Sequence, residues 1–320
     1  MIMIIDIELT TLTESNADSF LLTFRSPDGN KHILIDGGLK RDGRQALKLI
    51  EKIFEQGEII DLVVLTHVDI DHVNGLLALF ESSKVNADNV GRVLFNVPNS
   101  IVEPELVKDK KTQCGYKEGN QLLELIIKKG IKLSQAIEGD QVNLGKEITI
   151  DILSPTKPAL ELDHEKWLKT HIGHDEDEDY DKEKLVEEKY KEDSKPQNLS
   201  SIVCLITCDE KRMLFCGDSV PSQIIKDYIG ETPVEILKIP HHGSKYNINK
   251  DLLTKFPSQK FLIPGNKSSY PNFYTIALIE DSFANSTVYV PKGSWVHSKR
   301  MNKEIELDFV EYEFGTRINI

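Results

Sequence analysis

The stretch Thr66-His67-Val68-Asp69-Ile70-Asp71-His72-Val73-Asn74-Gly75 places two imidazoles and two carboxylates within six residues. The apolar run 59–65 before it is typical of a buried strand, and the run 76–80 after it indicates the start of a helix. Side chains this close together would repel one another, or lose hydration at a cost, unless a cation drew them in. A polar loop that caps the next helix is the alternative, but capping needs one such residue and this loop holds four. We therefore predict a metal site where this strand ends.

This stretch resembles the His-x-His-x-Asp-His signature of the metallo-β-lactamase fold, with Asp69 where the second His usually stands. The variant Thr-His-x-Asp-x-Asp-His is similar to the one in the C-terminal domain of the DNA-uptake protein ComEC and its soluble relatives. The resemblance implies an α/β (α+β) fold, a four-layer αβ/βα sandwich with its ligands on loops at one edge of two facing sheets. It implies metal binding but no particular substrate, because the family hydrolyses lactams, thioesters, lactones and phosphodiesters.

The rest of the chain alternates strand-like and helical segments, which agrees with this architecture. Residues 42–56 and 119–130 have apolar positions on one helical face, a glycine stops each of them, and a further helix is expected around 221–229. Strands are expected at 1–9, 20–24, 32–36, 93–97, 148–153, 201–207, 213–216, 234–239, 261–263, 288–290 and 304–309. The glycines of Asp36-Gly37-Gly38 either let the backbone pass close to the metal loop or form a simple tight turn. We expect a single domain over residues 1–320.

Residues 156–197 interrupt this pattern with a highly charged segment that is low in aliphatic residues. Its part 175–193 holds eleven acidic residues and four lysines, a balance of −7 within a net charge of −13 for the chain. We interpret 156–197 as an insertion within the domain, partly helical around 184–191. Its acidic run is interpreted as a solvated face and a candidate docking surface for a protein partner. Three histidines in or before this run are expected to be exposed: His164, His171 and His174.

The composition is that of a soluble globular protein, with 39% hydrophobic and 28% charged residues among 320. No run approaches the roughly 20 apolar residues that cross a bilayer, and the N-terminus lacks the features of a secretory signal. We therefore expect a cytoplasmic protein without membrane association. Its four cysteines form no Cys-x-x-Cys pair, which fits buried free thiols in a reducing compartment. No basic stripe tracks a long nucleic acid, which favours a small or locally gripped substrate.

Two motifs in the second half resemble the remaining metal ligands of the family. Gly217-Asp218 follows a strand-like run and resembles the motif in which one carboxylate bridges two metals about 3.5–4 Å apart. The stretch His241-His242-Gly243-Ser244 matches the final motif, and at least one of its histidines is expected to bind metal. The other could hold a phosphate oxygen or move a proton. Ser244 and Lys245 could bind an anionic substrate, although a plain polar loop explains them equally well.

Two departures from the family pattern change the expected ligand set. The region where a further His usually stands reads Gln197-Asn198-Leu199-Ser200, so Asn198 is a candidate for substrate contact rather than metal binding. Near the end, Tyr270-Pro271-Asn272-Phe273 stands where ComEC-like members carry Tyr-Gly-His-Pro, and it contains no His. A histidine role at that place in relatives therefore does not carry over to this chain.

The resemblance and these departures together predict two divalent metal ions, Zn²⁺ or Mn²⁺, that share Asp218. One position would draw on Asp71, His72, Asp218 and either His241 or His242. The other would draw on His67, Asp69 and Asp218, a set poorer in imidazole and richer in oxygen. Because oxygen-rich sites favour Mn²⁺ or Mg²⁺, the His67 and Asp69 position is expected to be the weaker one.

The predicted chemistry is hydrolysis by a metal-activated water that Asp69 or Asp71 orients. The resemblance to ComEC-like members favours a metal-dependent phosphodiesterase or nuclease, with nucleic acid or a nucleotide as substrate. Two alternatives stay open: a carbonyl-directed hydrolase of a lactone or thioester, and a non-catalytic or regulatory protein that keeps the fold. The retained ligands disfavour the regulatory reading, since a decayed site would have lost some of them.

Overall fold

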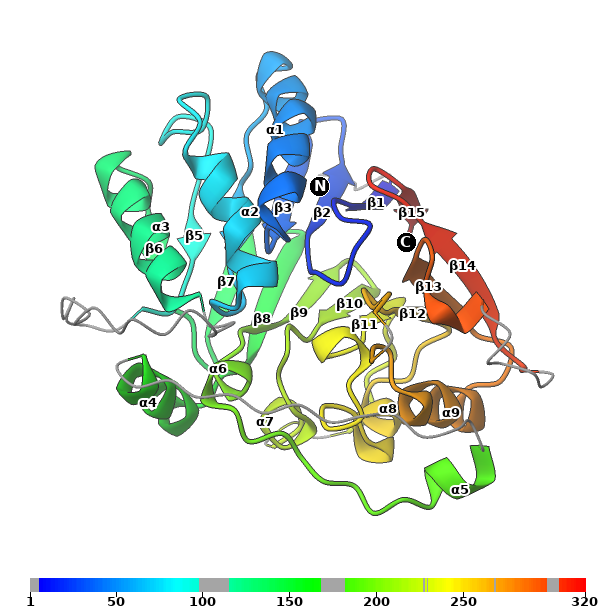
Figure 1. Cartoon of the computed structure of the whole chain (residues 1–320). Coiled ribbons are helices and arrows are strands. Elements are labelled where there is room, and N and C mark those ends of the chain that lie inside the picture. The colour runs from blue at the N-terminus through cyan, green and yellow to red at the C-terminus, as the bar shows by residue number, and fades with distance from the viewer. Residues whose placement is uncertain are drawn as a thin grey trace.

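The computed structural model describes residues 6–97, 115–167, 182–226, 228, 230–267, 269–297 and 305–320. In these parts the chain forms two facing mixed sheets, with helices on both outer faces (Figure 1). This arrangement confirms the expected α/β class and the four-layer αβ/βα sandwich. No helix in the described part of the chain is long and apolar enough to cross a membrane.

The first sheet holds the N-terminal half of the chain together with the last strand. Its order is β15 (Arg317–Asn319), β1 (Asp6–Thr11), β2 (Phe20–Arg25), β3 (Lys31–Ile35), β4 (Leu62–Val64), β5 (Val93–Leu94) and β6 (Leu133–Ser134). Strands β15 to β3 pair antiparallel, whereas β3 to β6 pair parallel. The parallel part therefore points the carboxyl ends of β3 and β4 to the same edge.

The second sheet is built from the following half of the chain. Its order is β14 (Asp308–Tyr312), β13 (Thr287–Pro291), β12 (Lys260–Leu262), β11 (Ile236–Lys238), β10 (Lys211–Phe215), β9 (Val203–Cys208), β8 (Ile148–Ser154) and β7 (Gln141–Leu144). Strands β10 to β14 pair parallel and β7 to β10 antiparallel. The expected strand 304–309 is thus displaced to Asp308–Tyr312, because it is 308–312 that pairs with β13.

The helices flank these sheets and bury apolar side chains against them. They are α1 (Lys40–Glu55), α2 (Ile70–Phe80), α3 (Tyr116–Lys128), α4 (Lys157–Lys166), α5 (Lys182–Val186), α6 (Pro196–Leu199), α7 (Pro221–Ile224), α8 (Lys250–Lys255) and α9 (Phe273–Ser282). Two 3₁₀ turns, η1 (His241–Gly243) and η2 (Trp295–His297), complete the described elements. The predicted helices 42–56 and 119–130 correspond to α1 and α3, whereas α7 is shorter than the expected 221–229.

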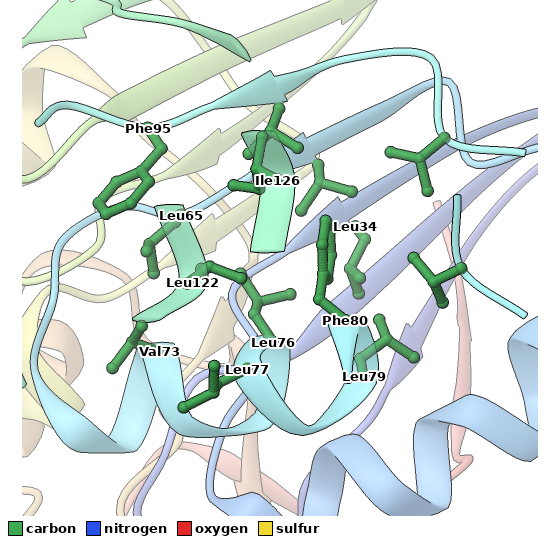
Figure 2. Packing of buried hydrophobic residues seen from close by; sticks show 14 of the residues in the cluster. Leu34, Leu65, Val73, Leu76, Leu77, Leu79, Phe80, Phe95, Leu122 and Ile126 are labelled. Atoms are coloured by element: carbon green, nitrogen blue, oxygen red, sulfur yellow. The ribbon is translucent and has the colours of Figure 1, made fainter. Parts of the chain in front are cut away.

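Three apolar clusters separate the four layers. One cluster fills the space between the first sheet and α1, α2 and α3; Figure 2 shows Leu76, Phe80 and Leu122 packed there. A second cluster lies between the two sheets, where Phe20 of β2 meets Phe215 of β10 with ring centroids 5.9 Å apart. The third packs α8 and α9 on the second sheet. Burial on both faces explains why most strands read as apolar runs in the sequence.

The described ends of the 156–197 segment are anchored to the domain. Trp167 is buried at the end of α4 and stacks on Tyr116 with centroids 4.5 Å apart. Leu185 of α5 is buried in the cluster with α9. The expected helix around 184–191 is therefore confirmed only as the short α5. His164 is half-buried rather than exposed, and His171 and His174 lie outside the described residues.

Candidate metal centre

Four loops meet at one edge of the sandwich, and each follows the carboxyl end of a strand. Strand β3 leads to Asp36, β4 to the stretch 66–72, β10 to Asp218 and β11 to the stretch 241–244. Gly37 permits a close approach of two backbone segments, since a Cβ there would lie 2.1 Å from the backbone nitrogen of Leu76. Gly37 is therefore required for backbone packing beside the metal loop, whereas Gly38 has a positive φ of 69° and a Cβ there would meet the Asp42 side chain. The sheet thus brings residues that are distant in sequence to one place.

Asp218 lies at the middle of the centre, and its two oxygens face different imidazoles. Its Oδ1 lies 3.5 Å from Nε2 of His72. Its Oδ2 lies 3.7 Å from Nε2 of His67 and 3.7 Å from Nε2 of His241. A carboxylate that faces two ligand groups in this way has the arrangement of a bridging ligand.

The first ligand group gathers around Oδ2 of Asp218. His67 contributes Nε2, which lies 3.8 Å from Oδ2 of Asp69, and His241 approaches the same carboxylate oxygen of Asp218. The group therefore contains two imidazoles and two carboxylates. From the sequence we expected only one imidazole in this group, and therefore a weaker metal position. Because the group contains two imidazoles, the structure does not support that expected difference in affinity.

The second ligand group lies on the Oδ1 side of Asp218. His72 faces Oδ1 itself, and Nε2 of His242 lies 3.0 Å from Oδ2 of Asp71. The His72 and His242 rings have centroids 5.8 Å apart. The two adjacent histidines thus point to different groups, His241 to the first and His242 to the second. Both have positive φ angles, 48° and 53°, an uncommon backbone conformation that turns neighbouring side chains to separate groups.

All four imidazoles present the same nitrogen to the centre. Nδ1 of His72 donates to Oδ2 of Asp36 at 2.8 Å, and Nδ1 of His242 donates to the Pro264 carbonyl at 3.1 Å. The other two rings follow the same pattern: Nδ1 of His67 lies 3.2 Å from Thr66 Oγ1, and Nδ1 of His241 lies 3.0 Å from Asn247 Oδ1. Because Thr66 donates its hydroxyl proton to Asp36 at 2.7 Å, it accepts from His67. In the neutral form of each ring, Nε2 is therefore left without a proton and faces a carboxylate, which is how metal-binding histidines are held.

Unpaired buried atoms test whether a cation fits these groups. Nε2 of His67, Nε2 of His72 and Oδ1 of Asp218 are buried and have no hydrogen-bond partner. His67, His72 and Asp218 also offer ligand atoms within 4.8 Å of one another. Buried polar atoms are normally satisfied, and leaving one without a partner costs roughly 1–3 kcal/mol. Cations bound between these atoms would remove that cost, so the donor set fits divalent metal ions.

The carboxylates of the centre are crowded. Burial raises the pKa of the Asp69 carboxyl to about 7, and the nearby charges of Asp71 and Asp218 add to the effect. Burial also disfavours ionisation of Asp218, but His241 and His72 outweigh it and hold its pKa well below the usual value. Positive charge is thus what keeps these carboxylates ionised together.

A second layer of residues that sequence reasoning did not assign to the site supports these ligands. Asp36 is fully buried and accepts hydrogen bonds from the backbone and side chain of Thr66, both at 2.7 Å. Asp18 is buried in an ion pair with Lys238, whose ammonium also donates to the Gly217 carbonyl at 2.7 Å. Asp18 also lies in a group with His72 and His242 that could hold a metal ion. The Asp-Gly-Gly motif could have pointed to Asp36, whereas Asp18 carried no sequence signal.

The three residues predicted to bind substrate lie near the centre in different ways. Asn198 is buried behind His241, with Nδ2 3.4 Å from Nδ1 of that ring. Ser244 is buried and accepts a hydrogen bond from the Tyr246 backbone at 3.3 Å. Lys245 lies 3.8 Å from Glu188 of the charged segment. Their contact with substrate stays a prediction.

An aromatic side chain lies beside the two adjacent histidines. The Tyr270 ring has its centroid 5.4 Å from that of His241 and 6.1 Å from that of His242. It belongs to the stretch Tyr270-Pro271-Asn272-Phe273. No histidine is present there, but the stretch still contributes a ring beside the ligands.

Comparison with known proteins identifies the architecture. Residues 12–260 match the Metallo-beta-lactamase superfamily. Zn²⁺-bound PqqB from Methylobacterium extorquens is similar in structure at 12% identity and a TM-score of 0.49, with 98% of this chain and 100% of that chain covered. YhfI from Bacillus subtilis, a metallo-beta-lactamase fold protein, is similar at 10% identity and a TM-score of 0.47, with 98% and 99% covered. A diphosphatase from the PhnP family is similar at 12% identity and a TM-score of 0.41, with 98% and 97% covered. Curated protein sequences gave no match.

Proposed function

This chain belongs to the metallo-beta-lactamase superfamily, and on that premise we propose that it is a metal-dependent hydrolase that cleaves a phosphodiester with an activated water. The observation that carries the proposal is the common orientation of the four imidazoles, each with Nδ1 held by an acceptor and Nε2 turned to a carboxylate. Metal-binding histidines are held in this way, so the arrangement supports cation binding at the Nε2 atoms.

Two groups of residues would hold the metals. The first is His67, Asp69, His241 and Asp218, and the second is Asp71, His72, His242 and Asp218. Bound divalent ions would supply a Lewis acid that activates water and neutralises the charge of a phosphodiester. Each group mixes two imidazoles with two carboxylates, a donor set compatible with Zn²⁺ or Mn²⁺.

Asp69 is the candidate for orienting the attacking water. Its Oδ2 belongs to the first ligand group, but its buried Oδ1 has no hydrogen-bond partner and can accept a hydrogen bond from water. Asp71 is less available, because its Oδ2 already faces Nε2 of His242 at 3.0 Å. Between the two carboxylates that the sequence offered for this role, the contacts therefore favour Asp69.

The phosphodiester class rests on the motifs that resemble ComEC-like members. Asp69 stands in place of a histidine, and the chain ends its ligand set with His-His-Gly-Ser. The comparisons reach the superfamily and not that branch, so the branch is part of the proposal. Substrate contact through Asn198 would involve Oδ1, which is buried without a partner, because Nδ2 donates to Asp193 at 2.6 Å. The Tyr270 ring and the Lys245 ammonium are further candidates for the substrate wall.

Two alternatives make different predictions in the same assay. The superfamily chemistry also attacks carbonyl groups, so a lactone or thioester hydrolase would use the same centre. A regulatory protein would bind metal without turnover, and the acidic 175–193 run would then be a docking surface for a protein partner. Both the docking role and the single-domain organisation with its insertion stay predictions.

Purified protein should be incubated with Zn²⁺ or Mn²⁺ and a panel of substrates: single-stranded DNA, RNA, cyclic nucleotides, a lactone and a thioester. The proposal expects turnover of at least one phosphodiester by the wild type, and none by Asp218→Asn, which alters the carboxylate shared by both ligand groups. Asp88→Asn is the matched control, because Asp88 is exposed on a loop after α2. Turnover of only the lactone or thioester would show that the substrate is a carbonyl compound and not a phosphodiester. Metal binding without any turnover would favour the regulatory alternative.

A further inference from the structure

The segment 188–195, at the end of the charged insertion, packs directly on the loop that carries the two adjacent histidines. The Tyr190 hydroxyl donates to the Tyr246 carbonyl at 3.0 Å, and the Asp193 backbone nitrogen donates to the same carbonyl at 2.9 Å. Nearby, Glu188 lies 3.8 Å from the Lys245 ammonium. These contacts show that the acidic run is not solvated throughout, because its last residues lie against the ligand loop.

The Asp193 carboxylate is the innermost part of this segment. Its Oδ2 accepts from Nδ2 of Asn198 at 2.6 Å and lies 3.5 Å from Nδ2 of Asn247. The same oxygen lies 3.6 Å from Nδ1 of His241, and Oδ1 accepts from the Lys195 backbone at 2.9 Å. The side chain is 10% exposed, so water competes little for these contacts.

These contacts determine how the Asn247 amide is turned. A carboxylate can only accept, so the amide directs its NH₂ group toward Asp193. That NH₂ group also donates to the Asp218 carbonyl at 2.9 Å. The Asn247 oxygen is therefore left to face Nδ1 of His241 at 3.0 Å. As an acceptor it requires a proton on Nδ1, which leaves Nε2 free on the side of Asp218.

We propose that Asp193 is a positioning residue of the metal centre. Its carboxylate lies 3.6 Å from Nδ1 of His241, and together with the Asn247 amide it fixes the ring orientation and the tautomer of His241. The charged insertion thereby completes the first ligand group, and this inference rests on the proposed metal-binding function. Asp193 is not a ligand itself, because it lies on the Nδ1 side of His241 whereas Asp218 lies on the Nε2 side.

The first test measures the affinity of each metal ion by competition with a chromophoric Zn²⁺ chelator. Asp193→Asn keeps the shape of the side chain, and Asp193→Ala removes both acceptor oxygens. Losing such an outer-shell partner costs about 10–100-fold in metal affinity, so the expected losses are about 10-fold for Asn and about 100-fold for Ala. Only one of two bound ions should weaken, because among the described residues Asp71, His72 and His242 form no hydrogen bond or ion pair with Asp193.

The matched control is Glu187→Gln, which removes one negative charge from an exposed position of the charged insertion. It should bind both ions as the wild type does, and His241→Ala should lose the same ion that Asp193→Ala weakens. If Asp193→Ala does not fold, Asp193→Asn decides the question. Equal affinities in Asp193→Asn and Glu187→Gln would overturn the inference, and so would equal weakening of both ions.

A second readout reports the tautomer directly. Long-range ¹H–¹⁵N spectra of the zinc-loaded protein, assigned by the signal missing in His241→Ala, should show a proton on Nδ1 of His241. In Asp193→Ala that signal should shift or broaden, whereas Glu187→Gln should leave it unchanged. An unchanged Nδ1 signal in Asp193→Ala contradicts the inference. A wild-type protein that binds no metal would instead contradict the proposed function.

Discussion

Nε2 of His241 lies 3.7 Å from Oδ2 of Asp218, the carboxylate oxygen that His67 also faces at 3.7 Å. His241 therefore supplies a second imidazole to the ligand group of His67 and Asp69. His242, one residue further on, turns instead to Asp71. A single dipeptide thus supplies one imidazole to each ligand group.

Substitution of the two histidines should consequently remove different metal ions. His241→Ala should lose the ion of the His67 and Asp69 group, and His242→Ala the ion of the Asp71 and His72 group. Each loss should exceed the about 10–100-fold effect of an outer-shell change, since a direct ligand is removed. Metal content per chain after dialysis, measured for both variants, checks this. Loss of the same ion from both variants would show that the two histidines serve one position.

Metal removal should lower thermal stability. Ligand binding to the native state stabilises it by about 2.7 kcal/mol at a hundredfold excess over Kd, so Zn²⁺ should raise Tm and a chelator should lower it. Asp218→Asn should abolish most of this metal-dependent change, whereas Asp88→Asn should retain it. Differential scanning calorimetry with and without chelator measures the difference. If neither metal nor chelator changes the Tm of the wild type, the protein has no metal centre that stabilises its fold.

The buried Asp18–Lys238 pair should matter for stability as well. Both side chains are almost fully buried, so Lys238→Met leaves Asp18 as an uncompensated charge and should lower the free energy of unfolding by about 3–5 kcal/mol. The double variant Asp18→Asn with Lys238→Met should recover part of that loss. Urea unfolding at fixed metal concentration measures these differences.

An exposed pair provides the control for this comparison. Lys250 and Asp281 lie 3.3 Å apart with side chains 70% and 38% exposed, so Lys250→Met should change stability by only about 0–1 kcal/mol. If Lys250→Met and Lys238→Met had equal effects, the buried pair would have no special role.

Gly37→Ala should disrupt the approach of β3 to the metal loop. The added Cβ would lie 2.1 Å from the Leu76 nitrogen and 2.7 Å from the Gly75 carbonyl carbon, and backbone atoms cannot move aside cheaply. Gly57→Ala is the comparison, because Gly57 has a positive φ but no neighbour within 4 Å of the added atom. That control should cost about 1–2 kcal/mol from backbone strain alone. Chemical denaturation should show a larger loss for Gly37→Ala, and equal losses would refute the packing role.

Much of the fold and part of the centre follow from local patterns. The 66–72 loop, Asp218 and the His241-His242 pair could be predicted because each lies at the end of an apolar strand-like run. Burial of the parallel strands on both faces produces those runs, and the loops that follow them meet at one sheet edge.

The rest of the centre depends on tertiary contacts that leave no local pattern. Asp18, Lys238 and Asn247 are single polar residues in ordinary surroundings, and only folding brings them beside the ligands. His241 and His242 turn to different ligand groups because both have positive φ angles, and the spacing of residues in the sequence does not reveal those angles. Asp193 belongs to an acidic run that we expected to be solvated. The density of charge in a sequence does not indicate which of the charged residues is buried.

The most direct test of the account is an anomalous-scattering map from crystals grown with Zn²⁺. Two peaks are predicted, both within about 2.0–2.2 Å of Asp218 oxygens, one bound by His67, Asp69 and His241, the other by Asp71, His72 and His242. A single peak, or one ion bound by both His241 and His242, would contradict it.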